Sequence, residues 1–254
     1  MVSYHSLLVL WVCFFSIVSC SSDDIIDQYG SRLVQISTTT TDNYEERTNL
    51  HYDQTGKVLT VEDFAQNLKF YIEYKDDKIL KHTSHYFHTP NSINAIDSFI
   101  YDQNGKLDKV NLYRRLSLAL KLSFEIDYIY DGHDMPSERK TIFLGSGKIV
   151  SAQKFFWRNN NLLKIQYFNH ENNMEGETEF QYDKLKNYKK LMPIISTDPL
   201  TLCENNVISF KFNSVTDPSQ LQCNPCVFKY KYNRDKYPVE IIHPIGKTEM
   251  LVYK

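Results

Sequence analysis

Hydrophobic and polar residues alternate along much of the chain with a period of two. The longest run places apolar side chains at every second position from Leu116 to Tyr130, with mostly polar residues between them. Shorter runs of the same kind occur at 68–74, 208–212 and 228–232. This period is typical of a strand with one buried and one wet face. No window of comparable length has helical periodicity, so the pattern predicts a mainly antiparallel β protein.

A short motif recurs between these runs. Residues 50–58 read Leu-His-Tyr-Asp-Gln-Thr-Gly-Lys-Val, and residues 99–107 read Phe-Ile-Tyr-Asp-Gln-Asn-Gly-Lys-Leu. Weaker copies begin at the aromatic residues 74, 130, 157, 182, 212 and 232, and the mean spacing of about 26 residues indicates a repeat architecture. Asp, Asn and Gly supply the positive φ angles of tight turns. Each copy therefore predicts a β-hairpin, although several lack the turn glycine and leave their register open.

These units resemble the YD repeats of RHS-type proteins, in the shorter form found in uncharacterised lipoproteins of the Bacteroidetes. The resemblance rests on Tyr-Asp-x-x-Gly-Lys at 52–57 and 101–106, with weaker copies at 182–187 and 232–239, and covers residues 48–254. It implies one domain, a sheet of consecutive hairpins that is curved or wrapped into an open barrel. It implies no established activity.

The composition narrows the class of protein. Hydrophobic residues make up 42% of the chain, which is enough to build a core. The 29 Lys and Arg nearly balance the 31 Asp and Glu, which argues against a nucleic-acid binder with a basic face. Among the aromatic residues are 18 Tyr and 15 Phe. We expect most of them on the core side of the sheet; the alternative is that exposed rings stack on sugars or on a partner protein.

The first nineteen residues predict an export signal. They contain no Asp, Glu, Lys or Arg, and their apolar run from Leu7 to Val18 is shorter than the roughly 20 residues of a membrane span. The run ends in Ile-Val-Ser-Cys at 17–20, which resembles the lipobox of bacterial lipoproteins, although residues 1–6 lack the usual Lys or Arg. An ordinary signal peptide or a single anchoring helix is the alternative.

The lipobox resemblance implies that Cys20 carries the lipid and is the first residue of the mature chain. Residues 20–47 then form the lipidated N-terminus and a linker with a possible first strand. Ser-Ser-Asp-Asp at 21–24 resembles the surface-export tags of Bacteroidetes lipoproteins. The expected location is the outer membrane, at the cell surface rather than on the periplasmic face.

Three cysteines remain outside the signal and the lipid site. They are Cys203, Cys223 and Cys226, the last two in Cys-Asn-Pro-Cys. A structural disulfide is favoured in an exported chain. Redox and zinc sites are less favoured, because the motif sits in a loop before a strand and no second Cys-x-x-Cys exists. A hairpin over 207–222 would bring Cys203 to Cys223, but the sequence leaves the pairing open.

Other features that suggest chemistry have simpler explanations. His82, His85 and His88 cannot converge on one face of a strand, so we expect solvent-facing histidines near a turn that ends at Pro90. Gly-Ser-Gly-Lys at 145–148 lacks the rest of a phosphate loop and predicts a hairpin turn. Most aspartates lie in turn motifs. We find no catalytic constellation and expect neither a metal ion nor a cofactor.

The sequence therefore favours a non-catalytic module, binding, adhesive or structural, held at the outer membrane by its lipid. A glycan or an envelope protein is the expected partner. One alternative is a glycan-active hydrolase with two carboxylates roughly 5–10 Å apart on a concave sheet. Another is an outer-membrane β-barrel, which the lipobox, the uneven strand lengths and the C-terminal Lys254 argue against.

Overall fold

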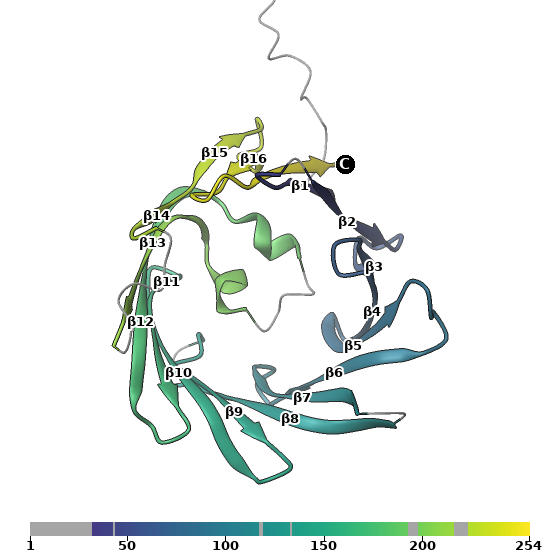
Figure 1. Cartoon of the computed structure of the whole chain (residues 1–254), viewed down its shortest axis with the longest axis vertical. Coiled ribbons are helices and arrows are strands. Elements are labelled where there is room, and N and C mark those ends of the chain that lie inside the picture. The colour runs from purple at the N-terminus through teal and green to yellow at the C-terminus, as the bar shows by residue number, and fades with distance from the viewer. Residues whose placement is uncertain (1–31, 43, 117–118, 133, 193–197, 216–222) are drawn as a thin grey trace, which may run out of the picture.

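The computed structural model describes residues 32–42, 44–116, 119–132, 134–192, 198–215 and 223–254. These residues form a 17-stranded sheet and two short 3₁₀ helices. The sheet curves into a nearly closed barrel with one unsealed seam (Figure 1). The prediction of a mainly antiparallel β fold built from consecutive hairpins is confirmed.

The elements follow one another as a train of hairpins. Neighbouring strands pair antiparallel from β1 to β14 and from β15 to β17, and β1 also pairs with β17. Their bounds are β1 Leu33–Thr39, β2 Glu45–Tyr52, β3 Val58–Asp63, β4 Leu68–Lys75, β5 Lys78–Tyr86, β6 Ile93–Tyr101, β7 Leu107–Leu116, β8 Ala119–Ile129, β9 Glu138–Phe143, β10 Lys148–Arg158, β11 Asn161–Asn169, β12 Met174–Lys186, η2 Tyr188–Leu191, η4 Pro199–Leu202, β13 Asn205–Ser214, β14 Cys226–Val227, β15 Lys229–Tyr232, β16 Pro238–Ile242 and β17 Thr248–Tyr253.

The seam lies between β13 and β15. Strand β14 pairs with β13, whereas β15 pairs with β16, and the chain changes partner at Phe228. Side chains bridge the interval instead of a backbone ladder: the Tyr230 hydroxyl donates to the Val207 carbonyl at 2.6 Å, and the Tyr232 hydroxyl donates to the Asp183 carboxylate. The two ends of the described chain also meet, because Arg32 and Lys254 exchange backbone hydrogen bonds of 3.1 and 2.9 Å.

The core lines the inner face of the ring. Alternate side chains of each strand point inward, and the best buried are aliphatic or aromatic, such as Leu33, Val61 and Val110. The largest cluster covers β1–β4, β16 and β17; smaller ones centre on Phe99 and on Leu162. Burial of these side chains is what holds the curved sheet together.

The repeated Asp and Gly each have a defined task in the turn. Asp53 accepts hydrogen bonds from the backbone N–H groups of Thr55 and Lys57 at 2.8 and 2.9 Å. Asp102 does the same for residues 104 and 106. The glycines that follow, Gly56 and Gly105, have φ angles of 91° and 79°, which a side chain would strain.

Turns that lack glycine place other residues in the left-handed region. Asp76–Asp77 and Asn159–Asn160 form two-residue turns with both φ angles positive, which is the type I′ geometry that matches the twist of a hairpin. Lys236 takes the glycine position of the β15–β16 turn, with φ 68°. The structure thereby fixes the registers that the sequence left open. Residues 145–148 also form a turn, between β9 and β10, as predicted.

An aromatic residue joins the two strands of a hairpin at seven places, six of them at repeated aromatic positions (52, 74, 101, 130, 157 and 182), and Tyr230 makes the same kind of contact across the seam, from β15 to β13. In each hairpin the polar atom of this residue, at the end of the second strand, donates to a backbone carbonyl at the start of the first, and we call this kind of contact the latch. The eight latches, 2.6–3.0 Å long, are Tyr52 to Leu33, Tyr74 to Val58, Tyr101 to Ile79, Tyr130 to Leu107, Trp157 to Pro136, Tyr182 to Leu162, Tyr230 to Val207 and Tyr253 to Pro238. Burial raises the pKa of Tyr52, Tyr74 and Tyr130 to about 12.

The motif lysine completes the unit. Lys57, Lys78 and Lys106 lie 5.1–5.4 Å from the centres of the rings of the next latch tyrosines, and Arg32 lies 5.9 Å from that of Tyr52. Each cation directly precedes the residue whose carbonyl accepts that latch. The motif Tyr-Asp-x-x-Gly-Lys therefore latches one hairpin, makes the turn and contacts the latch of the next hairpin.

Two expectations about the strands need correction. The alternating run from Leu116 to Tyr130 is not one strand, because Leu116 ends β7 and β8 begins at Ala119. The register against β7 also shifts between Leu122 and Phe124. This bulge buries Ser123 and leaves Leu122 37% exposed, since an extra residue moves later side chains to the other face.

Candidate functional site

One hairpin connection differs from the others. The copy at 182–187 was predicted to form a hairpin turn, but β12 runs on to Lys186 and β13 begins only at Asn205. The described residues between them, 187–192 and 198–204, lie inside the ring, where Figure 1 shows η2 and η4 in green within the circle of strands. We call these residues the inner segment. The repeats that close with a short turn have no segment of this kind, so the inner segment is the candidate position of a site.

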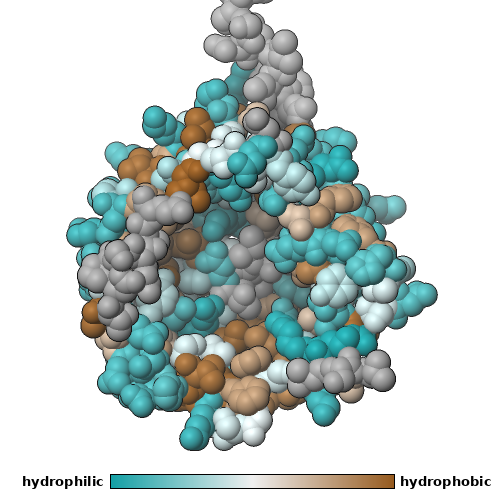
Figure 2. Space-filling view, viewed as in Figure 1, coloured by the Kyte–Doolittle hydropathy of each residue, from teal (hydrophilic) through white to brown (hydrophobic). Residues whose placement is uncertain are grey.

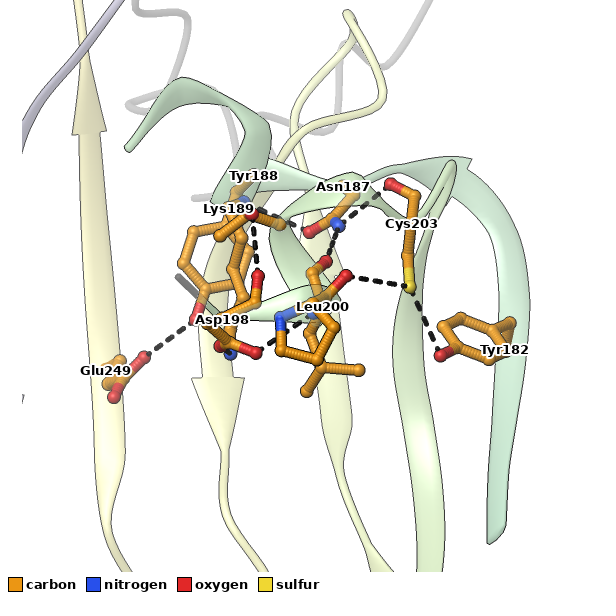
Figure 3. Close-up of polar contacts among 10 residues, drawn as sticks. Tyr182, Asn187, Tyr188, Lys189, Asp198, Leu200, Cys203 and Glu249 are labelled. Atoms are coloured by element: carbon orange, nitrogen blue, oxygen red, sulfur yellow. Dashed lines mark hydrogen bonds and ion pairs between the residues drawn. The ribbon is translucent and has the colours of Figure 1, made fainter. Parts of the chain in front are cut away.

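Side-chain hydrogen bonds fold the inner segment back on itself (Figure 3). The buried Asn187 amide donates to the carbonyls of Leu200 and Cys203 at 2.8 and 3.0 Å and accepts from the Lys189 N–H at 3.0 Å. Asp198 caps η4 by accepting from the Leu200 N–H at 2.9 Å. Because one buried amide binds backbone groups of both 3₁₀ helices, it fixes the distance between them.

The wall of the ring holds the inner segment at several points. The Cys203 sulfur lies 3.4 Å from the Tyr182 hydroxyl, and the Tyr188 hydroxyl donates to the Glu249 carboxylate at 3.5 Å (Figure 3). Burial opposes the charged form of Glu249, but His243 and Lys247, which both lie 3.2 Å from its carboxylate, lower its pKa below the usual value. Met192 belongs to the largest core cluster. The inner segment is thus a packed part of the fold.

A cavity of about 580 Å³ lies between the inner segment and the inner face of the sheet. Its aromatic walls come from Phe180, Phe210, Phe228 and the tyrosines at 167, 188 and 230. Polar groups converge on it from Arg139, Gln153, Thr178, Lys189 and Asp198. Figure 2 shows that the molecule is hollowed at its centre, with hydrophobic side chains beside the hollow. We call this cavity the luminal pocket; its size is that of a small-molecule site.

The luminal pocket has a positive balance of charge. The described lining residues include two cations, Arg139 and Lys189, and one anion, Asp198, so their net charge is positive; Lys189 and Asp198 form an ion pair of 3.1 Å. The pocket also reaches the seam, since Val207 lines it from one side and Tyr230 from the other. An apolar site with a few placed polar groups orients a ligand through those groups.

The luminal pocket contains one carboxylate among its described lining residues, Asp198. A second depression, of about 560 Å³ at the rim, is lined by Asp131 and Asp134 beside Trp157. Asp134 is exposed and pairs with Lys106 at 3.2 Å. Neither place presents a buried pair of acids in the described chain, and no group of three metal-ligating residues occurs there.

The three cysteines do not meet in one place. Cys223 and Cys226 form a disulfide, whereas Cys203 is a buried thiol that packs against Leu162 and Ile165. The pairing of Cys203 with Cys223 that a hairpin over 207–222 would have favoured is therefore not formed. Burial raises the pKa of the Cys203 thiol.

The histidines are only in part where we expected them. His82 was expected to face solvent, but it is 4% exposed on the inner face of β5. Its burial follows from the alternation that places Ile72 opposite it on β4. His88 lies beyond the end of β5 and is exposed.

Sequence reasoning missed the polar residues of the luminal pocket, Arg139, Gln153, Lys189 and Asp198. None of them belongs to the repeated motif. The spacing of the copies gave no signal either, because the 30 residues from 182 to 212 differ little from the 29 residues from 101 to 130. Nothing in the repeat therefore marks the side chains that β9 and β10 contribute.

The predicted signal of residues 1–19, including Cys13, and the predicted lipid site Cys20 lie outside the described residues. Among the residues that the structure does describe, no helix is long and apolar enough to cross a membrane.

Comparisons with known proteins identify the fold. No protein-family profile and no curated protein sequence matches the chain. A solved porin-like protein from Bacteroides uniformis ATCC 8492 superposes with a TM-score of 0.56 at 9% identity, covering 89% of this chain and 99% of that one. A porin-like protein from Bacteroides vulgatus ATCC 8482 gives 0.53 at 12%, covering 88% and 99%. The Photorhabdus luminescens Tc holotoxin pore gives 0.34 at 12%, covering 78% and 9%. At these identities, the similarity to the two Bacteroides proteins is one of fold.

Proposed function

We propose that this protein is a lipid-anchored, non-catalytic binding module of the outer membrane, and that its luminal pocket holds a small amphipathic ligand with one anionic group. The observation that carries the proposal is the inner segment, which replaces a tight turn and makes a walled cavity inside the ring. The similarity of fold to the two Bacteroides porin-like proteins is the only support that the comparisons give to an envelope location.

The lining of the luminal pocket suggests the class of ligand. Aromatic and aliphatic side chains surround most of the space and favour an apolar or aromatic body. The net positive charge of the described lining favours a carboxylate or a similar anion, and the Arg139 guanidinium adds planar, charge-assisted donors. A cationic ligand would meet two cations and a single carboxylate that Lys189 already pairs.

Charged side chains on the outer face of the sheet indicate that the outside of the ring faces water. Ion pairs cross neighbouring strands on that face, at distances of 2.6–3.3 Å: Lys69–Glu62, Lys81–Glu73, Lys109–Glu125, Lys164–Glu177 and Lys231–Glu240. A lysine that faces lipid at the middle of a bilayer costs about 2–4 kcal/mol. This distribution argues against the hypothesis that the outer face lies in a membrane.

Lipidation of Cys20 would fix which end of the ring lies near the membrane. Arg32, where the described chain begins, lies beside the turn after β2, at the rim where the latches lie. Metabolic labelling with an alkyne fatty acid tests the anchor. We expect labelling that Cys20→Ser abolishes and Cys13→Ser preserves; equal labelling of both variants would contradict the anchor.

A set of three naphthalene probes tests the luminal pocket. 2-Naphthoate, 2-naphthol and 2-naphthylmethylammonium share one ring system and differ in charge. Isothermal titration calorimetry should show one site per chain, with 2-naphthoate binding at least tenfold more tightly than the other two. Absence of binding by all three probes, or preference for the cation, would refute the proposed ligand class.

Two variants locate that binding. Arg139→Gln should remove the preference for 2-naphthoate over 2-naphthol, because it removes the excess charge. Arg158→Gln, at the exposed end of β10, is the matched control and should bind 2-naphthoate like the parent protein. If both variants lose binding equally, the probe does not occupy the luminal pocket.

A further inference from the structure

A further cavity, of about 380 Å³, lies against strands β4–β7, and none of its described lining residues belongs to the inner segment. Leu68, Phe70 and Ala95 give it an apolar side. Its polar lining comes from Gln66, His82, Ser84, Asn94, Asp97, Arg114 and Arg115. No residue of the luminal pocket lines it, so the two cavities are separate sites.

His82 is the least expected member of this lining. It is 4% exposed, and its Nε2 is buried with no hydrogen-bond partner among the described residues. Burial lowers the pKa of His82 to about 4, so its imidazole is neutral at pH 7. The ring packs edge-on against Phe99, with centroids 4.7 Å apart. An unpaired buried polar atom is destabilising, and a ligand at the cavity wall would supply the missing hydrogen-bond partner.

Two guanidinium groups are already positioned at the same cavity. Arg114 donates to the Asp97 carboxylate at 2.6 Å and to the Tyr113 carbonyl at 3.0 Å, while Arg115 is held by the Ile93 carbonyl. These contacts leave further N–H donors on both guanidiniums, since each carries five. Asp97 is the only acid among the described lining residues, so these residues, with Arg114 and Arg115, carry an excess of one positive charge.

The remaining polar groups are neutral and small. Ser84 is buried, and the Asn94 amide donates to its hydroxyl at 3.5 Å. Hydroxyl and amide groups both donate and accept, which suits the hydroxyl groups of a ligand. The excess positive charge and the neutral hydrogen-bonding groups of this cavity therefore suit a ligand that has a carboxylate and hydroxyl groups.

We propose that this cavity binds a small hydroxylated carboxylate of about the size of a uronic acid. The carboxylate lies toward Arg114 and Arg115, and the hydroxyl groups meet His82, Ser84 and Asn94. The apolar face of the ligand packs on Leu68 and Phe70.

Three probes separate the contributions to binding. D-Glucuronate has both features, D-glucose lacks the carboxylate, and cyclohexanecarboxylate lacks the hydroxyl groups. Calorimetric titration of the full protein should show D-glucuronate binding at least tenfold more tightly than either of the others. Equal affinities, or no binding of D-glucuronate, would overturn the proposal.

Two variants give readouts that a structural role would not. His82→Phe keeps a ring against Phe99 and removes the unsatisfied nitrogen, so the thermal midpoint should stay or rise while D-glucuronate affinity falls at least tenfold. His85→Phe is the control, because His85 points to the opposite face of β5, and it should bind normally. Unchanged binding by His82→Phe would overturn the proposal.

Arg115→Gln provides a second test, because Arg115 is exposed and its loss should not prevent folding. We expect at least a tenfold loss of D-glucuronate affinity and little change in the weak binding of D-glucose. Retention of D-glucuronate binding by this variant would contradict the charge argument even if His82→Phe failed to fold.

Discussion

Strands β1–β8 and strands β12–β13 use the same hairpin unit differently. In the first region the hairpins after Tyr52, Tyr74 and Tyr101 are joined by short turns, and a motif lysine contacts each next latch. In the second region Tyr182 keeps its latch, but the chain continues into the inner segment. The Asp183 carboxylate still accepts from the Leu185 N–H at 2.9 Å, as Asp53 does from Thr55, but it also binds Asn206 and, across the seam, Tyr232.

This difference shows how a repeat acquires a site. The regular units provide a stable curved wall with buried side chains and satisfied carbonyls. The interrupted unit provides a cavity, since its additional residues fill only part of the ring. The following predictions test this division, from the largest effect to the smallest.

Removal of a regular core side chain should cost the most stability. Phe99→Ala should lower the free energy of unfolding by about 3–5 kcal/mol, because Phe99 is 2% exposed and its loss leaves a cavity. Phe180→Ala, in the wall of the luminal pocket, should cost less, since that side chain already borders empty space. Urea unfolding measures both; equal losses would contradict the comparison.

Alkaline pH should destabilise the ring through its latches. The folded pKa of Tyr52, Tyr74 and Tyr130 is raised to about 12 from 10, so the unfolded chain loses these protons first. The stabilisation is complete below pH 10 and is lost as pH rises toward 12. Urea midpoints between pH 8 and 12 measure the loss, and a variant with Phe at all three positions should show a shallower decline.

Removal of one latch should have a moderate effect. Tyr74→Phe leaves the Val58 carbonyl without its 3.0 Å hydrogen bond and should cost about 1–3 kcal/mol. Tyr71→Phe, on the 41% exposed neighbouring ring, should change stability little. Equal effects of the two substitutions in urea unfolding would show that the latch hydrogen bond does not stabilise the fold.

Two turn substitutions should have small effects of opposite sign. Gly105→Ala places a side chain at φ 79° and should cost about 1–2 kcal/mol. Lys236→Gly relieves the same kind of strain at φ 68° and should stabilise by about 0.5–1 kcal/mol. Thermal midpoints check both signs; destabilisation by Lys236→Gly would mean that its side chain contributes more than its backbone costs.

The wall of the ring could be predicted from the sequence because its causes are local. Alternation indicated strands, and Asp53 and Gly56 indicated the turn that they make. The latch was not predicted, since it joins Tyr52 to a carbonyl nineteen positions earlier. A bulge such as the one at Ser123 could not be predicted from the sequence either, because it depends on the neighbouring strand.

The sites could not be predicted because they depend on how distant strands meet. Arg139 on β9 and Lys189 in the inner segment share the luminal pocket only because the sheet curves into a ring. His82 was expected in solvent, since a histidine near polar residues gives no sign of the curvature that buries it. Charge and spacing along the chain do not contain that information.

The luminal pocket can be tested most directly by a crystal structure of the protein with 6-bromo-2-naphthoate, whose bromine gives an anomalous signal. We predict one bromine peak between the inner segment and strands β11–β13, with the carboxylate beside Arg139. A peak only on the outer face of the sheet, or no peak at saturating ligand, would contradict the account.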